Sequence, residues 1–350
     1  MTLRRIGIAF GIVALILACA AAGLYWWADR AVTAGHRLAL ARAPEGWLGA
    51  MRATARVPDL AAFALPRTVD GDGSATAYDS ALRWTPPPRF QAAYGTLTRD
   101  RPATASDSTL WREVAADAAL DRFVAAARLR GWDATARATE GGDTVNLFAV
   151  ELPRSSGARF ACQGLIMRAR MRLARRDVAG ARTDLAAAVA LGEQMARREP
   201  TLLGALAGKR ILAEALRAYG VFAAATGDSA LARAASTVEA WAASRRGTNL
   251  TLLEAAPDSA LSLAADTTVP LGWRGEALAA ILFSDLLRIR GLIFGVPAST
   301  VEAIRPFATD RDPDLARLAR IALATAERIN RAPRSQRWRS IMSNYSASRP

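Results

Sequence analysis

Two short stretches carry residues at spacings that resemble ligand-binding loops. The segment GALAGKR, residues 204–210, has two glycines ahead of Lys209, as a loop that cradles phosphate groups would have. Its glycines, Gly204 and Gly208, are one residue too close together, and Arg210 stands where such a loop places a magnesium-binding serine or threonine. We therefore expect this segment to lie within a helix, with its glycines serving helix packing.

The second stretch, DGDGSATAYDSA, offers Asp70, Asp72 and Ser74 at alternate positions, as a calcium loop does. It lacks the glycine at the sixth position and the glutamate at the twelfth that complete such a loop. A solvated turn followed by a helix cap accounts for the same residues, and this is the structure that we expect.

Residues that commonly bind transition metals or act as nucleophiles are scarce in this chain. His36 is the only histidine and has no cysteine or carboxylate at ligand spacing nearby. Cys19 and Cys162 lie far apart, and no nucleophile elbow or dinucleotide-binding glycine pattern occurs. The sequence therefore predicts no cofactor, no metal site and no catalytic residue, although distant carboxylates could still converge in three dimensions.

The N-terminal segment predicts a membrane anchor. Residues 6–27 carry no charge, and this run of 22 residues is long enough for a helix to cross a hydrocarbon layer of about 30 Å. Arg4 and Arg5 precede the run, and Trp26 and Trp27 close it where aromatic side chains would meet lipid headgroups. We expect an uncleaved, single-pass anchor in a bacterial inner membrane, with the bulk of the chain outside the cytoplasm.

Two alternatives remain open for this segment. The letters ILAC, which end at Cys19, resemble the lipobox of a bacterial lipoprotein, although the chain stays apolar for eight more residues. The small residues Ala18 and Ala20 could instead direct cleavage by a signal peptidase. Gly7 and Gly11 form a G-x-x-x-G pair through which two spans could approach closely and form an oligomer.

The composition favours helices. Hydrophobic residues make up 51% of the chain, and alanine and leucine supply most of them, which favours helix because alanine has the smallest cost there. The formal charge of +14 comes almost wholly from arginine, since Lys209 is the single lysine. These arginines are scattered through nearly every predicted helix, whereas a nucleic-acid binding surface needs a basic stripe. We predict an all-α fold and expect no nucleic acid as a partner.

The positions of prolines and charges divide the chain into parts. One helix is expected over residues 107–130, ended by Gly131. The four parts, in order, are a membrane anchor over 1–28, a stalk and proline-rich region of short helices over 29–103, a helical-hairpin domain over 104–330, and a basic mobile tail over 331–350.

Three aspartates mark the starts of similar helices. Asp177, Asp228 and Asp312 are each followed four residues later by an alanine and then an arginine. The aspartate would cap the new helix, and the alanine would face the preceding helix, where a small side chain permits a close crossing. We therefore expect Ala181 and Ala232 to lie where consecutive helices cross most closely.

This pattern resembles tetratricopeptide repeats over about residues 160–245. Ala169 and Gly220 supply the small residue that the family places in the helix before each turn. Asp177 and Asp228 are 51 residues apart, against about 34 in the family, which indicates longer helices. The resemblance implies a short α-solenoid of helical hairpins, and an irregular helical bundle is the alternative.

The resemblance also implies a binding surface. In such repeats the first helix of each hairpin lines a concave face with its second, fifth and ninth positions. Arg170 and Arg217 would then face one groove, where the planar guanidinium group suits a carboxylate, whereas in a plain bundle both would be solvated. The candidate partner-binding residues are Gln163, Ile166, Arg170, Glu214, Arg217 and Val221.

Together these features predict a binding or scaffolding protein of the bacterial cell envelope. It would be anchored through residues 6–27 and would bind another envelope protein or an anionic polymer. The alternative is an envelope hydrolase whose carboxylates converge only in three dimensions.

Overall fold

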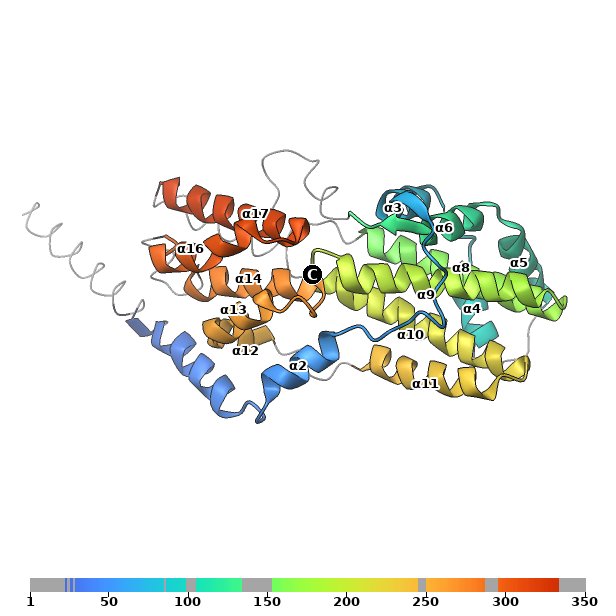
Figure 1. Ribbon diagram of the computed structural model, residues 1–350, viewed down its shortest axis with the longest axis horizontal. Coiled ribbons are helices and arrows are strands. Elements are labelled where there is room, and N and C mark those ends of the chain that lie inside the picture. Colours follow the sequence, from blue (N-terminus) through green and yellow to red (C-terminus); the bar gives the residue numbers. More distant parts are fainter. Residues whose placement is uncertain are drawn as a thin grey trace, which may run out of the picture.

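The computed structural model describes residues 23, 26–27, 29–84, 86–98, 105–133, 153–244, 250–286 and 295–333. These residues form an almost entirely helical protein, which confirms the all-α prediction (Figure 1). Within the described part of the chain, no helix combines the length and the apolar character needed to cross a bilayer. The predicted span over residues 6–27 lies largely outside the described residues, as do Gly7, Gly11, Cys19 and residues 334–350 of the predicted tail.

The elements follow one another with short connections. Residues 29–41 are helical, and the later elements are α2 (Trp47–Ala55), β1 (Val69–Asp72), α3 (Gly73–Arg83), α4 (Phe90–Thr98), α5 (Ala105–Ala116), α6 (Ala119–Ala127), β2 (Leu129–Gly131), α8 (Pro153–Ala174), α9 (Val178–Arg198), α10 (Leu202–Ala225), α11 (Ser229–Ala243), α12 (Leu250–Ala255), α13 (Pro257–Ala265), α14 (Leu271–Leu286), α16 (Ala298–Ile304), the 3₁₀ helix η1 (Arg305–Thr309) and α17 (Pro313–Arg331).

Four long helices, α8 to α11, form two helical hairpins in series. Asp177 begins α9 and accepts a hydrogen bond from the backbone N–H of Gly180, and Asp228 begins α11 in the same way. Thr201 caps α10 through the N–H of Gly204. These side chains satisfy N–H groups that the first turn of a helix leaves without a partner. The predicted helix starts are confirmed, including that of α17 at Asp312.

The two hairpins approach each other closely where α10 crosses α9. A Cβ atom added to Gly208 of α10 would lie 2.3 Å from the backbone nitrogen of Ala196 in α9. The same addition at Gly220 would meet α11 only at 3.7 Å, at Ala235. Ala181 is fully buried as expected, but Ala232 is only half-buried. Ala232 lies opposite Gly220, since its carbonyl oxygen is 3.8 Å from the added Cβ atom. That Ala181 and Ala232 mark the closest crossings of their own hairpins stays a prediction.

One helix was expected over residues 107–130, but the structure has two. The chain leaves the helix after Ala116 because the Asp117 carboxylate accepts a hydrogen bond from the N–H of Ala119, at 2.8 Å, and so starts α6. The indole N–H of Trp84 donates to the same carboxylate at 2.7 Å. After α6 the chain enters β2, which pairs in parallel with β1. Trp84, which is distant in sequence, thus helps to fix the point at which α5 ends and α6 begins.

Two hydrophobic cores share α10. The first extends from Leu60 to Ala242 and includes side chains of α3 to α11, while the second joins α2 to α12, α13, α14 and α17. Leu202 and Ala205, at the start of α10, belong to the second core and Leu206 packs against it, while the residues from Ile211 to Phe222 that are buried lie in the first. In Figure 1 the two groups of helices accordingly lie toward opposite ends of α10. The first core crosses the expected boundary at residue 104.

Candidate functional site

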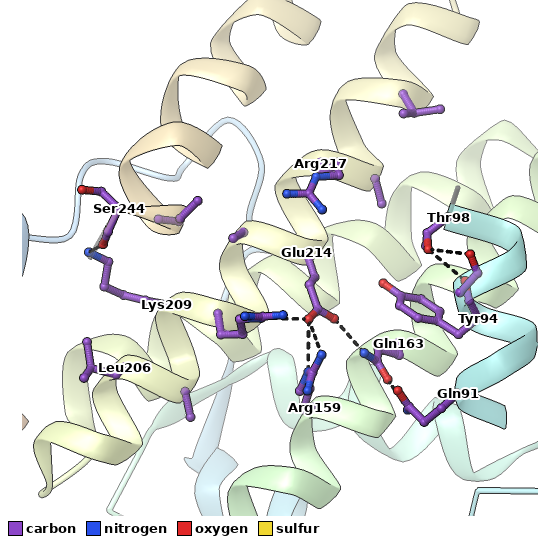
Figure 2. A pocket seen from close by; sticks show the side chains of 18 of the residues that line it. Gln91, Tyr94, Thr98, Arg159, Gln163, Leu206, Lys209, Glu214, Arg217 and Ser244 are labelled. Carbon is purple, nitrogen blue, oxygen red and sulfur yellow. Dashed lines mark hydrogen bonds and ion pairs between the residues drawn. The ribbon is translucent and has the colours of Figure 1, made fainter. Parts of the chain in front are cut away.

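A groove runs along one face of α10, between α4, α8 and the C-terminal end of α11 (Figure 2). It encloses about 840 Å³. Its residues on α10 extend from Leu203 to Val221 and recur at three- and four-residue steps, which places them on one helical face. At 1.5 Å per residue this face is about 27 Å long. Such a length suits a linear segment better than a compact small molecule.

Five of the six residues predicted to bind a partner line this groove: Gln163, Arg170, Glu214, Arg217 and Val221. Ile166 does not line it, and its side chain is fully buried in the first core. Residues 161–169 of α8 are all buried, since α3, α5, α9 and α10 pack around this helix. The prediction for Ile166 is therefore wrong.

A hydrogen-bond network occupies the centre of the groove. Glu214 Oε1 accepts from Arg159 Nε at 3.1 Å, from Arg159 Nη2 at 2.8 Å and from Arg210 Nε at 3.3 Å. Glu214 Oε2 accepts from Gln163 Nε2 at 2.8 Å, and Gln163 Oε1 accepts from Gln91 Nε2 at 2.7 Å. Gln163 and Glu214, which hold equivalent places in the predicted repeat, thus meet across α8 and α10 (Figure 2).

Positive charge dominates the groove. Arg217 donates to Glu239 of α11 at 2.6 and 2.9 Å, and Arg170 donates to the Leu97 carbonyl oxygen at 2.7 Å. Glu214 is the single carboxylate among the described residues that line the groove. An excess of cations in a concave surface attracts anions. The cations that line it are Arg159, Arg170, Lys209, Arg210 and Arg217.

Sequence reasoning missed several groove residues, and only some of them left a signal. Arg159 stands four residues before Gln163, and Arg210 stands four residues before Glu214, so each pair shares a helical face. Adding the residues one helical turn before the predicted Gln163 and Glu214 would have found both arginines. Tyr94 reaches the groove from α4, and no pattern in the sequence relates α4 to α10.

Lys209 lines the groove as a structural cation. Its side chain is almost buried, and Nζ donates to the carbonyl oxygens of Thr54 at 3.1 Å and Ser244 at 3.3 Å. Nζ also lies 4.4 Å from the ring centroid of Trp241. The lysine therefore ties α2 and the end of α11 to α10. As expected, GALAGKR lies within a helix.

Replacing Lys209 with methionine is expected to alter the pH dependence of stability. Burial lowers the pKa of Lys209 to about 8 from an ordinary 10.5, so the native state loses this proton before the unfolded chain does. The penalty for burying the charge is present below pH 8 and fades as the pH approaches 10.5. Urea unfolding should show the wild type gaining stability relative to Lys209→Met between these values. A constant difference over that range would contradict the assignment.

Comparison of the chain with protein-family models, curated proteins and solved structures found no match. The function of the groove is therefore inferred from the residues that line it. Both carboxylate oxygens of Glu214 already accept hydrogen bonds from arginine or glutamine. Burial and the charge of Glu214 raise the pKa of Tyr94 well above its ordinary range, so this hydroxyl group does not supply an anion to the groove.

A hydrolase would need a second acid or a nucleophile close to Glu214. Burial raises the pKa of the nearby Cys162 thiol far above its ordinary range, so this thiol is not an activated nucleophile. Within the described residues, no three or more histidines, cysteines or acids gather where they could hold a metal ion. Cationic donors outnumber the single carboxylate among the described residues that line the groove, and this arrangement suits the binding of an anionic group.

Proposed function

We propose that this chain is a membrane-anchored binding protein of the bacterial cell envelope, and that its groove along α10 holds an anionic segment of a partner protein. The observation that carries the proposal is the groove's charge. Four arginines and Lys209, which backbone carbonyl groups hold, stand against Glu214 in the lining and Glu239 beside it. An acidic segment would gain charge-assisted hydrogen bonds from arginines that already point into a concave surface. The length of the groove provides room for several residues of such a segment.

The arrangement of the hairpins supports a short stack of repeats similar to tetratricopeptide repeats. The first helices of the two hairpins, α8 and α10, contact each other and together form the wall and floor of the groove. Their equivalent positions Gln163 and Glu214 are hydrogen-bonded at 2.8 Å. The sequence of residues 6–27 supports the anchor, and Arg30 stacks its guanidinium group at 3.9 Å over Trp26, at the end of that segment.

Reversing two groove charges tests the proposal. Arg210 and Arg217 have side chains that are 57% and 62% exposed, so Arg210→Glu with Arg217→Glu should leave the fold intact. The double variant places two negative charges where an acidic segment would bind. We expect in-cell crosslinking with mass spectrometry to show at least a tenfold loss of the partner that the wild type captures, with thermal unfolding within a few degrees.

The matched control reverses two arginines outside the groove. Arg305 and Arg331 are at least as exposed as the groove pair, and each also forms an ion pair within one helical turn. Arg305→Glu with Arg331→Glu changes the net charge by the same amount. Equal losses of crosslinks in both double variants would indicate a general charge effect and contradict a binding role for the groove.

A further inference from the structure

We infer that Glu214 is an internal counter-anion, which a bound ligand must displace from Arg159 and Arg210, and that the groove therefore selects a run of acidic residues over a single carboxylate. This inference rests on the proposed function. It concerns how the groove discriminates between anions, which net charge alone does not determine.

Glu214 already occupies the donors that a ligand's carboxylate would use. Arg159 directs Nε and Nη2 to one oxygen of Glu214, and Arg210 adds its Nε to the same oxygen. A carboxylate from outside would meet guanidinium groups whose best-placed donors are engaged, and it would be repelled by the charge of Glu214. In the described part of the chain, the terminal nitrogens of Arg210 and Nη1 of Arg159 have no partner. These donors remain for a first contact.

A second arginine is held in the same manner further along α10. Arg217 lies seven residues after Arg210, which is two turns and about 10 Å along the helix. Glu239 accepts both Nε and Nη2 of Arg217 through a single oxygen. The groove therefore has two cationic centres, one at Glu214 and one at Glu239, and each carries its own carboxylate.

Tethering gives these internal carboxylates an advantage over a free monoanion. A group fixed on the same structure competes at an effective concentration of about millimolar or more. A single carboxylate binds an exposed guanidinium group too weakly to overcome this. An extended acidic segment rises about 3.4 Å per residue, so it can reach both centres at once. Once one carboxylate of the segment has bound, its other carboxylates are also held close to the arginines. They then compete with Glu214 and Glu239 on equal terms and can displace both.

The test compares two anions on the full-length protein in detergent micelles at low salt. The probes are capped hexaglutamate and N-acetylglutamate amide, which carries one carboxylate, and titration calorimetry measures their dissociation constants. We expect the wild type to bind hexaglutamate and to show no measurable binding of the monocarboxylate. Glu214→Gln keeps the side chain's shape but removes its charge, so we expect at least tenfold tighter binding of hexaglutamate and measurable binding of the monocarboxylate.

Two further variants keep the test decisive. Glu327→Gln removes one negative charge from an exposed ion pair on α17, outside the groove, and should leave both affinities within twofold of the wild type. Glu239→Gln releases Arg217 at the more exposed centre and should tighten hexaglutamate binding about threefold. A thermal melt shows whether Glu214→Gln folds. If it does not fold, the affinity of Glu239→Gln for hexaglutamate tests the inference in its place.

The outcomes separate the inference from the proposed function. If the wild type binds hexaglutamate and Glu214→Gln binds it equally or more weakly, Glu214 only positions its arginines and the inference is overturned. Tripolyphosphate binding tighter than hexaglutamate would overturn the assignment to an acidic peptide. If neither the wild type nor any variant binds either carboxylate probe, the proposed function itself fails.

Discussion

Replacing Asp184 with asparagine is expected to lower the free energy of unfolding by about 3–5 kcal/mol. Asp184 is fully buried in α9 and accepts hydrogen bonds from Arg168 Nε at 3.1 Å and Arg168 Nη2 at 2.7 Å. Arg172 adds an ion pair at 3.0 Å. Arg168 is itself buried, so loss of the carboxylate charge would leave a guanidinium group out of water with too little compensation.

Asp121 provides the matched control for this change. Its carboxylate also accepts from Arg168, through Nη1 at 2.7 Å, but its side chain is 69% exposed. Asp121→Asn should cost no more than about 1 kcal/mol, since water screens and replaces an exposed pair. Urea denaturation measures both. A loss at Asp184 as small as that at Asp121 would show that the buried cluster is not a main support of the α8–α9 hairpin.

Two glycines on α10 are expected to respond to alanine with opposite signs. Gly208→Ala would place a methyl group 2.3 Å from a backbone atom of α9, so the helices must move apart, at a cost of about 1–3 kcal/mol or more. A methyl group on Gly220 would instead make ordinary contacts at 3.7 and 3.8 Å with α11. Because alanine is the better helix former, Gly220→Ala should stabilise the protein by up to about 1 kcal/mol.

Denaturation midpoints of the two variants, measured under identical conditions, test this contrast. Both residues lie inside the same helix, so the gain in helix propensity is common to both and the difference reports the helix contact alone. A stabilised Gly208→Ala variant would mean that α9 and α10 do not pack as closely as the structure has them.

The sequence by itself determined the features that depend on neighbouring residues. Asp177, Asp228 and Asp312 mark helix starts because a cap bonds to N–H groups two or three residues away. The resemblance to tetratricopeptide repeats selected Glu214 and Arg217 on α10, as it selected Gln163 and Arg170 on α8. These signals were enough to predict the hairpins and five of the thirteen residues that line the groove on α8 and α10.

Only the tertiary structure decided which groups meet across helices. Ile166 holds the repeat position equivalent to that of Arg217, which was predicted to face the groove. Its side chain is buried instead, because α3 and α5 pack on α8 and cover most of that helix. Glu214 could have paired with any nearby arginine, and the alignment of α8 with α10 selects Arg159. Trp84 reaches Asp117 from another helix and helps to end α5. Contacts of this kind depend on how helices distant in sequence are oriented and aligned, and the periodicity of one helix holds no information about the position of another.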